Sequence, residues 1–290
     1  MNAAPYAQVE QPAPGVRRVL ARNPSPFTFT GTQTHIVGAG EVAVVDPGPD
    51  LPEHVAAVLS ATAGERIVAI LVTHTHRDHS PAAAALTAAT GAPVVGCAPL
   101  TTPGGDWGES VDAAYAPDRV LEDGATVTGG DWTLRAVATP GHMSNHLCFA
   151  WEEQRVLFSG DHVMGWSTSV ILPPDGHMGD YLASLNKLAA RDDRVYYPAH
   201  GSPVDEPAKL VRGLLAHRRA REAQIVRTLE TGPADVAALV ARNYPGLDPA
   251  LVPAAGASVL AHLIHLQEQK RVVREGAAWA LLPAAREDGA

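Results

Sequence analysis

The chain has 290 residues, 46% of them hydrophobic, and a formal net charge of −9. This length fits one large domain or one domain with a small appendage, and the hydrophobic content is sufficient for a sizeable core. The negative charge excludes a general polyanion binder for the molecule as a whole.

Targeting signals and cysteine usage bear on the compartment. The N-terminus has no basic stretch followed by an apolar one, so we expect no secretory signal. No apolar run reaches about 18 residues, so no membrane span is expected. Cys97 and Cys148 both lie in apolar surroundings. We expect them to be reduced core residues, which favours a reducing compartment, the cytoplasm.

The first part of the chain is predicted to alternate strands with helices. Residues 1–14 are rich in Pro and Ala and are expected to lack regular structure. Strands are predicted over 16–21, 33–37, 42–46, 66–72 and 93–97, and helices over 51–62 and 82–90. Ser80 is the expected N-cap of the second helix, with Pro81 at its first position. Residues 101–115 are expected to form a loop near the mouth of a site.

The apolar strand over 66–72 runs directly into a turn that is rich in potential metal ligands. Four of them fall within six residues: His74, His76, Asp78 and His79. His74 and His76 are two apart, so at a strand end they point to one side. Asp78 and His79 lie past the bend and reach a second position nearby. Imidazole and carboxylate donors suit Zn or Fe. The alternative is a polar surface turn, which the later ligand candidates argue against.

The second part of the chain is also strand-rich. Strands are predicted over 119–128, 132–138, 146–151, 155–159 and 194–198, and a helix over 181–190. Three further ligand candidates stand at the ends of these strands: His142, Asp161 and His200. The segment 165–178 follows Asp161 and is expected to shape substrate access. These patterns alone support a mixed α and β fold.

The motif His-x-His-x-Asp-His over 74–79 resembles the signature of the metallo-β-lactamase superfamily of hydrolases. The remaining motifs of that family follow in order, at 46, 140–142, 159–161 and 200–201, and the resemblance runs from about residue 15 to 205. It implies an α/β fold, a four-layer αββα sandwich over residues 1–204, with metals at one edge between the sheets. It also implies that Asp46 orients a ligand histidine. From the residues alone, Asp46 could instead be a helix or turn cap.

The resemblance further implies a centre of two metal ions. His74, His76 and His142 would bind one ion, Asp78, His79 and His200 the other, and Asp161 would bridge them. Zinc is the expected metal, with Mn²⁺ or Fe as alternatives. A water held between two such ions loses its proton near neutral pH and becomes the nucleophile. Asp78 is also assigned a catalytic role, and His177 is the candidate proton donor to the leaving group.

After Pro203 the composition changes. Helices are predicted over 206–230, 234–242 and 257–269, followed by a hairpin over 271–282. Three helices and a hairpin resemble a small winged-helix domain over 205–290. The alternative is a helical cap without a partner. The first helix carries six Lys and Arg residues between 209 and 227 against a single acid, Glu222. Lys209, Arg212, Arg218 and Arg219 form the candidate basic face.

Three functions remain open. The segment 23–34, the ending around His200 and the tail resemble the lactamase-β-like subfamily, some members of which are single-strand-specific endoribonucleases. The first hypothesis is therefore a dinuclear zinc phosphodiesterase of single-stranded RNA. The second is a thioesterase resembling hydroxyacylglutathione hydrolases, acting on a small-molecule ester or thioester. The third is a ligand-sensing DNA-binding regulator, which the complete ligand set disfavours. The ligands do not separate the first two, although overall acidity favours a small substrate. The resemblance also suggests a homodimer.

Overall fold

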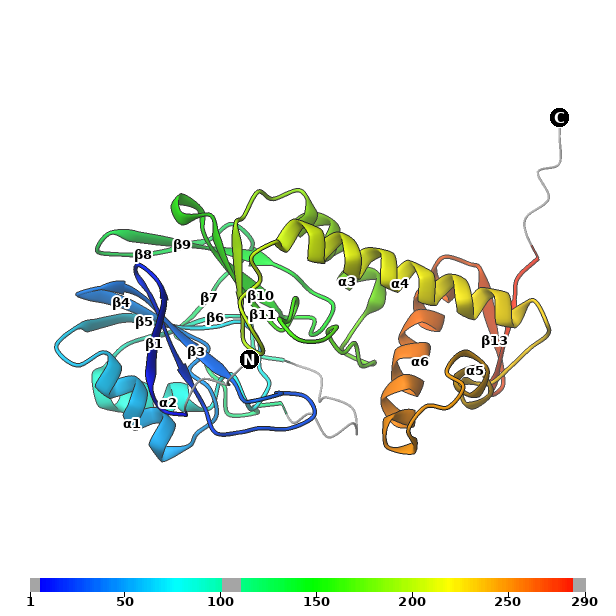
Figure 1. Ribbon diagram of the computed structural model, residues 1–290, viewed down its shortest axis with the longest axis horizontal. Helices are drawn as coiled ribbons and strands as arrows, with labels where there is room; N and C mark the ends of the chain where they lie inside the picture. The colour runs from blue at the N-terminus through cyan, green and yellow to red at the C-terminus, as the bar shows by residue number, and fades with distance from the viewer. Residues whose placement is uncertain (1–5, 101–110, 284–290) are drawn as a thin grey trace.

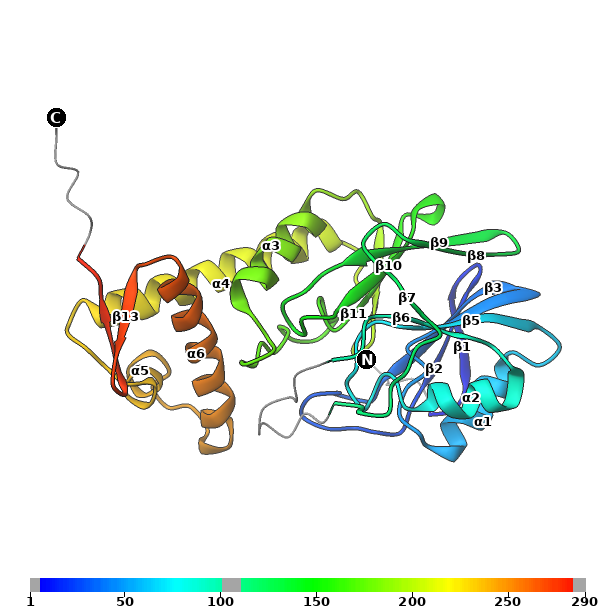
Figure 2. The same ribbon diagram turned by 180° about the vertical axis from the view of Figure 1, so that it is seen from behind.

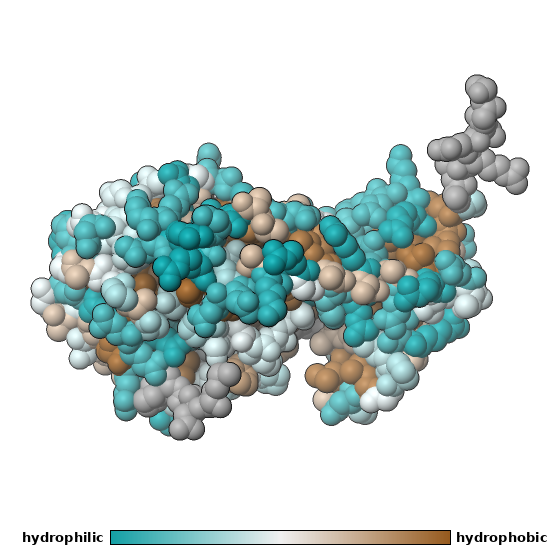
Figure 3. Space-filling model, turned by 45° about the horizontal axis from the view of Figure 1, so that its top comes forward, coloured by the Kyte–Doolittle hydropathy of each residue, from teal (hydrophilic) through white to brown (hydrophobic). Residues whose placement is uncertain are grey.

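The computed structural model describes residues 6–100 and 111–283, and it has two parts (Figures 1 and 2). The larger part consists of two facing β-sheets with helices on the outer side of each. A smaller C-terminal part is joined to it by the long helix α4 (Pro207–Leu229). In the space-filling view a recess separates the two parts along one side (Figure 3). Residues 101–110 of the loop expected over 101–115 lie outside the described residues.

The first sheet has seven strands in the order β1 to β7. They are β1 Val9–Ala13, β2 Val16–Leu20, β3 Gln33–Ala39, β4 Glu41–Val45, β5 Arg66–Val72, β6 Val94–Gly96 and β7 Arg119–Val120. Strands β1 to β4 are antiparallel neighbours, and β4 to β7 are parallel. Parallel neighbours require crossover connections, and α1 (Pro52–Ala61) and α2 (Ala82–Thr90) supply those from β4 to β5 and from β5 to β6. Strand β1 corrects the expectation that residues 1–14 lack structure.

The second sheet has five strands in the order β12-β11-β10-β9-β8. They are β8 Thr126–Gly129, β9 Trp132–Ala138, β10 Leu147–Trp151, β11 Val156–Gly160 and β12 Val195–Pro198, with the 3₁₀ turn η1 Glu152–Gln154 between β10 and β11. The outer face is covered by α3 (Met178–Ala189) and by α4. The single strand expected over 119–128 is wrong: β7 and β8 belong to different sheets, because the chain turns at Gly124 with φ +82°.

The start of α2 also differs from expectation. Ser80 does not cap α2; Pro81 is the N-cap residue, and the Ser80 hydroxyl donates to Asp112 Oδ2 at 2.7 Å instead. Cys97 and Cys148 are free and buried, as predicted.

Three apolar cores organise the molecule. The first lies between the two sheets and includes Ile36, Ile70 and Phe158. The second lies between the outer face of the second sheet and helices α3 and α4. Each fully buried large apolar side chain contributes roughly 1.5–3 kcal/mol. The third core belongs to the C-terminal part. The predicted αββα sandwich with a winged-helix domain is confirmed, and the ligand-bearing strand ends are fixed by the first core.

The C-terminal part contains three more helical segments and a hairpin. They are α5 Val236–Asn243, η2 Pro249–Leu251, α6 Val252–Glu268, β13 Val272–Glu275 and β14 Ala278–Leu281. Helix α4 serves both parts: Val211 and Leu214 enter the second core, whereas Ile225 and Leu229 enter the third. The boundary at 204/205 therefore falls just before a helix that both parts share, and it stays a prediction.

One segment departs from the expectation about membrane spans. Pro249–Glu268 is long and apolar enough to cross a membrane by length and composition alone. Within it, α6 supplies Val259, Leu263 and Leu266 to the third core. The core helix of a folded domain passes the same test of length and composition, so this finding is weak evidence for a membrane segment.

Candidate metal centre

The structure brings all seven predicted ligand residues to one edge of the sandwich. His74, His76, Asp78 and His79 follow β5, His142 follows β9, Asp161 follows β11, and His200 follows β12. Six of the seven side chains are buried and Asp78 is half-buried. They form two groups, and within each group the ligand atoms lie within 4.8 Å of one another. Strand ends from both sheets meet here, which explains how residues up to 126 positions apart converge.

The first group contains His74, His76, His142 and Asp161. The Nε2 atoms of His74 and His142 lie 2.8 and 3.1 Å from Nδ1 of His76. Burial and the neighbouring histidines hold the pKa of His74 well below its ordinary value, so this ring is neutral. Three imidazole nitrogens that converge in a buried position, beside a carboxylate, form a donor set that fits a divalent cation.

The second group contains Asp78, His79 and His200. Asp78 Oδ2 lies 3.3 Å from His79 Nε2 and 3.1 Å from His200 Nε2. Asp161 stands between the groups: its Oδ1 is 3.3 Å from His200 Nε2, and its Oδ2 is 3.7 Å from His142 Nε2. Oδ2 is also 3.6 Å from His79 Nε2, so the Asp161 carboxylate lies near donors of both groups, where a bridging ligand would lie.

The electrostatics of the centre are set by its carboxylates. Burial opposes ionisation of Asp78 and Asp161, but the adjoining His79 and His200 hold both carboxyl pKa values well below their usual range. Burial likewise opposes protonation of the two histidines, but the carboxylates raise the pKa of His200 to about 10 and that of His79 well above its ordinary value. Positive charge is therefore strongly favoured at this position, whether carried by protons or by metal ions.

Side chains and backbone behind the ligands fix their orientation. Asp46 accepts hydrogen bonds from Thr73 N at 2.8 Å and from His79 Nδ1 at 3.0 Å. His142 Nδ1 donates to the carbonyl of Val170 at 2.6 Å, and His200 Nδ1 lies 3.2 Å from a backbone carbonyl. When the outer ring nitrogen donates in this way, the inner nitrogen presents its lone pair to the centre. Asp46 thus orients a ligand histidine, as predicted.

Two glycines allow the ligand turns to pack closely. Gly141 has φ +138°, and a Cβ there would lie 2.3 Å from Tyr181 Cα. Gly160 has φ +50°, and a Cβ there would lie 2.7 Å from His146 Nε2 and 2.9 Å from Thr73 Oγ1. Any larger residue would displace the turns that carry His142 and Asp161.

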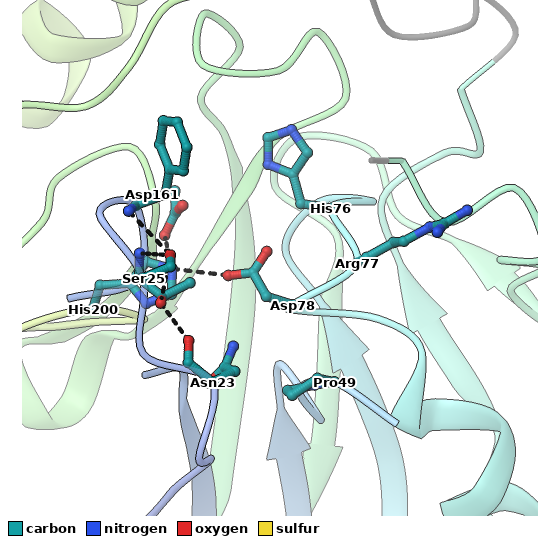
Figure 4. A pocket seen from close by; sticks show the side chains of 10 residues that line it. Asn23, Ser25, Pro49, His76, Arg77, Asp78, Asp161 and His200 are labelled. Atoms are coloured by element: carbon teal, nitrogen blue, oxygen red, sulfur yellow. Dashed lines mark hydrogen bonds and ion pairs between the residues drawn. The ribbon is translucent and has the colours of Figure 1, made fainter. Parts of the chain in front are cut away.

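A pocket of about 300 Å³ opens onto the centre (Figure 4). Its floor includes Asp78, Asp161 and His200. Its lining is completed by Asn23, Ser25, Phe27, Thr28, Pro49, His76 and Arg77. Loop residues between β2 and β3 therefore form one side of the pocket, and Thr32 of the same loop donates to Asp78 Oδ2 at 3.2 Å.

The structure does not bring His177 to this pocket, so its assignment as proton donor needs correction. His177 is the N-cap residue of α3, and its Nδ1 accepts from Asp180 N at 3.2 Å. Its Nε2 lies 2.8 Å from Glu268 Oε2 on α6. Both ring nitrogens are used in capping α3 and in joining it to the C-terminal part.

Sequence reasoning missed the role of Arg218. This side chain is buried, its guanidinium lies 5.4 Å from the Tyr181 ring, and it donates to the carbonyl of Ser169. The next residue, Val170, orients His142. Arg218 therefore does not belong to the exposed basic face with Arg212 and Arg219, which are exposed. The signal was its position in the apolar series Val211, Leu214, Leu215, Arg218, whose three- and four-residue spacing marks the inner face of α4.

Comparison with known proteins agrees with this architecture. Residues 28–200 match the family model of the metallo-beta-lactamase superfamily, and residues 236–279 match that of the beta-lactamase associated winged helix domain. An atrochrysone carboxyl ACP thioesterase of Cryptosporiopsis sp. is 33% identical over 235 residues, which cover 78% of this chain and 66% of that protein, slightly less than two thirds of its length.

Two further similarities extend over most of the chain. The beta-lactamase-like protein 2 homolog of Caenorhabditis elegans is 33% identical over 226 residues, covering 77% of this chain and 73% of that protein. The crystal structure of a beta-lactamase domain protein from Burkholderia ambifaria superposes with a TM-score of 0.81, at 22% identity, over 97% of this chain and 95% of the other. This structural likeness supports the fold of both parts.

Proposed function

The chain belongs to the metallo-beta-lactamase superfamily of hydrolytic enzymes, and from this premise we propose that it is a dinuclear, zinc-dependent thioester hydrolase. The observation that carries the proposal is the position of Asp161. Its two oxygens contact histidines of both ligand groups, at 3.3 Å for His200 and 3.7 Å for His142. A site for one ion needs no such shared carboxylate.

Each residue of the centre would bind one metal ion or both. His74, His76 and His142 would hold one ion, Asp78, His79 and His200 the second, and Asp161 both. Metal ions bound there lower the pKa of a water and stabilise negative charge that develops on a carbonyl oxygen. Asp78, Asp161 and His200 form the pocket floor, so a thioester carbonyl in the pocket would lie beside the reacting groups. Asp46 and the Val170 carbonyl would keep the ligand rings in place.

A thioester fits the site better than single-stranded RNA, the competing substrate. Among the described residues that line the pocket, Arg77 is the only Lys or Arg. RNA binding depends on several contacts from cations to phosphates, and the net charge of −9 opposes it. The buried position of Arg218 further weakens the basic face of α4. The name of the Cryptosporiopsis relative supports a thioester substrate.

The proposal is tested with a panel of substrates on full-length protein. Chelator-treated protein is reloaded with Zn²⁺ or Mn²⁺ and assayed with acyl thioesters of N-acetylcysteamine and with a single-stranded RNA. We expect about two ions per chain by elemental analysis and metal-dependent release of thiol. The matched control is Asp131→Asn, an exposed acid on the β8–β9 hairpin, which should change neither result. RNA cleavage without thiol release would contradict the proposal.

Cytoplasmic localisation and a homodimer are further proposals from the sequence. The two buried, free cysteines support a reducing compartment. Fractionation of the native cells and light scattering of the purified protein would test them.

A further inference from the structure

Three exposed aromatic side chains lie on or against the loop that forms one side of the pocket. Phe27, Phe29 and Trp166 are 43%, 49% and 38% exposed, and Phe27 lines the pocket itself. The rings of Phe29 and Trp166 stack with centroids 4.9 Å apart and planes 14° apart. Large apolar side chains that gather in the open beside a site mark a binding surface. We name Phe27, Phe29 and Trp166 the aromatic wall.

The loop that carries Phe27 and Phe29 is built to hold them in place. Asn23 Oδ1 accepts from Thr32 N at 2.9 Å, and Asn23 Nδ2 donates to Thr32 Oγ1 at 2.9 Å, which closes the loop at its base. Ser25 Oγ accepts from the backbone N–H of Phe27 at 3.1 Å. Phe29 has φ +57°, a left-handed conformation that is strained for so bulky a residue. Phe29 therefore combines a strained backbone with an exposed ring.

Both sides of the aromatic wall are tied to the ligand residues. Thr32 joins its loop to Asp78 through the 3.2 Å hydrogen bond to Oδ2. On the other side, Gly165 precedes Trp166 and donates its N–H to the carbonyl of His200 at 3.0 Å. A group held against Phe29 and Trp166 is thus at a fixed position relative to the metal centre.

We propose that the aromatic wall binds a flat, aromatic acyl group of the thioester substrate, so that the enzyme prefers aryl and polycyclic acyl thioesters over short aliphatic ones. This inference rests on the proposed thioester hydrolase activity. Flat rings pack on aromatic side chains in offset-stacked or edge-to-face arrangements, beyond the gain from burial alone. A short acyl chain such as acetyl would leave the three rings exposed. RNA bases also stack on aromatic rings, but RNA binding depends on several contacts from cations to phosphates, and among the described residues that line the pocket only Arg77 is a Lys or Arg.

The test compares two thioesters of one thiol, 2-naphthoyl- and acetyl-N-acetylcysteamine, on zinc-loaded protein. The wild type should hydrolyse the naphthoyl ester with a kcat/KM roughly tenfold higher or more. Phe29→Ala and Trp166→Ala should each raise KM for the naphthoyl ester about 5- to 10-fold. Both should leave kcat/KM for the acetyl ester and the metal content unchanged. Phe29→Tyr keeps the ring and should retain the preference. Leu251→Ala, an exposed apolar residue of η2, is the matched control.

The possible outcomes separate the two proposals. Hydrolysis of neither thioester by the metal-loaded wild type would overturn the thioesterase proposal and this inference with it. Equal hydrolysis of both esters, or a parallel loss for both in Phe29→Ala and Trp166→Ala, would overturn only the inference. The same holds if these variants weaken cleavage of single-stranded RNA and leave the thioesters unchanged, because the wall would then stack bases.

Discussion

The molecule contains two clusters of histidines and acids that differ in how their rings are held. At the centre, ring nitrogens of different histidines face one another at 2.8 and 3.1 Å, and the outer nitrogens of His79 and His142 bond to Asp46 and Val170. At the junction of the two parts, His177, His262 and His265 each face a carboxylate, Glu222 or Glu268, on a neighbouring element. We call this second set the junction cluster.

Residue type alone therefore does not identify a metal centre. The junction cluster has three histidines and two acids, compared with five histidines and two acids among the candidate ligands, but among the described residues its ligand atoms do not converge. Its contacts include His177 with Glu268 at 2.8 Å and Arg271 with Glu222 at 2.7 Å, as in ordinary ion pairs. The centre differs because Asp46 and backbone carbonyls behind the rings direct the lone pairs of His79, His142 and His200 inward.

The change with the largest expected effect is Asp161→Ala. Both ligand groups lose the carboxylate that lies between them, so metal content should fall from about two ions per chain toward one or none. Hydrolysis should fall by roughly 10³-fold or more, because metal ions contribute several kcal/mol to the reaction. Elemental analysis and thiol-release kinetics measure both effects.

The matched variant in the junction cluster is Glu222→Gln. It also removes a half-buried acid among histidines, and metal content should stay at about two. If Asp161→Ala retained two ions and full activity, the centre would not be the reacting site. If Glu222→Gln lost metal, the junction cluster would contribute to metal binding, and the difference between the two clusters would be contradicted.

A smaller effect is expected for Asp46→Asn, which keeps the shape of the side chain but weakens its contact with His79. Residues that orient metal ligands typically contribute 10–100-fold to metal affinity, so zinc affinity should fall by about that factor. Competition with a chromophoric chelator measures it. Glu65→Gln, which removes the partner of Arg17 at 2.7 Å, is the control and should leave affinity unchanged. Equal affinities for wild type and Asp46→Asn would show that orientation by this acid is unimportant.

Much of the fold, and the two groups that the candidate ligands form, could be predicted because the signals are local. Strands β5 and β9 and helix α2 have the predicted bounds. Each is a continuous run of residues that favour one kind of secondary structure, and residues that interrupt this pattern stand on both sides of it. The ligands follow strand ends in short motifs, and a family pattern assigns them. Orientation by Asp46 was also predicted from its motif.

What failed depends on partners distant in sequence. Strand β1 is a Pro-containing edge strand that is held by its pairing with β2. The sequence around His177 does not reveal its contact with Glu268, which lies 91 residues further on. Arg218 was placed on an exposed basic face, whereas α3 covers it. Helix α6 begins five residues earlier than predicted, at Val252, with Pro253 in its first turn.

His35 differs from the histidines of both clusters, because it has neither a metal group nor an acid beside it. Burial, with a contribution from Arg18, lowers the pKa of His35 to about 3. Its Nε2 has no hydrogen-bond partner among the described residues. The unfolded chain takes up a proton near pH 6.5 while the folded state does not, so this contribution to stability is present above pH 6.5 and is lost as the pH falls toward 3.

From pH 7 to pH 5 this effect should lower the free energy of unfolding by about 2 kcal/mol at most. Urea unfolding of chelator-treated protein at both pH values measures it. His35→Leu removes the titrating group. The free energy of unfolding of this variant should therefore fall by about 2 kcal/mol less than that of the wild type over the same pH range. An unchanged pH dependence in His35→Leu would mean that His35 is protonated in the folded state.

The smallest effect is expected for the ion pair between His177 and Glu268. His177 and Glu268 are 29% and 52% exposed, and exposed ion pairs contribute only about 0.2–1 kcal/mol. A double-mutant cycle of His177→Gln and Glu268→Gln should give a coupling energy in that range by urea unfolding. Lys209→Gln with Glu206→Gln, an exposed pair within one segment at 3.0 Å, is the matched control and should give no more. Metal content and kcat for thioesters should not change in His177→Gln. A tenfold fall in kcat, with metal and stability intact, would restore His177 as the proton donor and would place the junction cluster within the catalytic machinery.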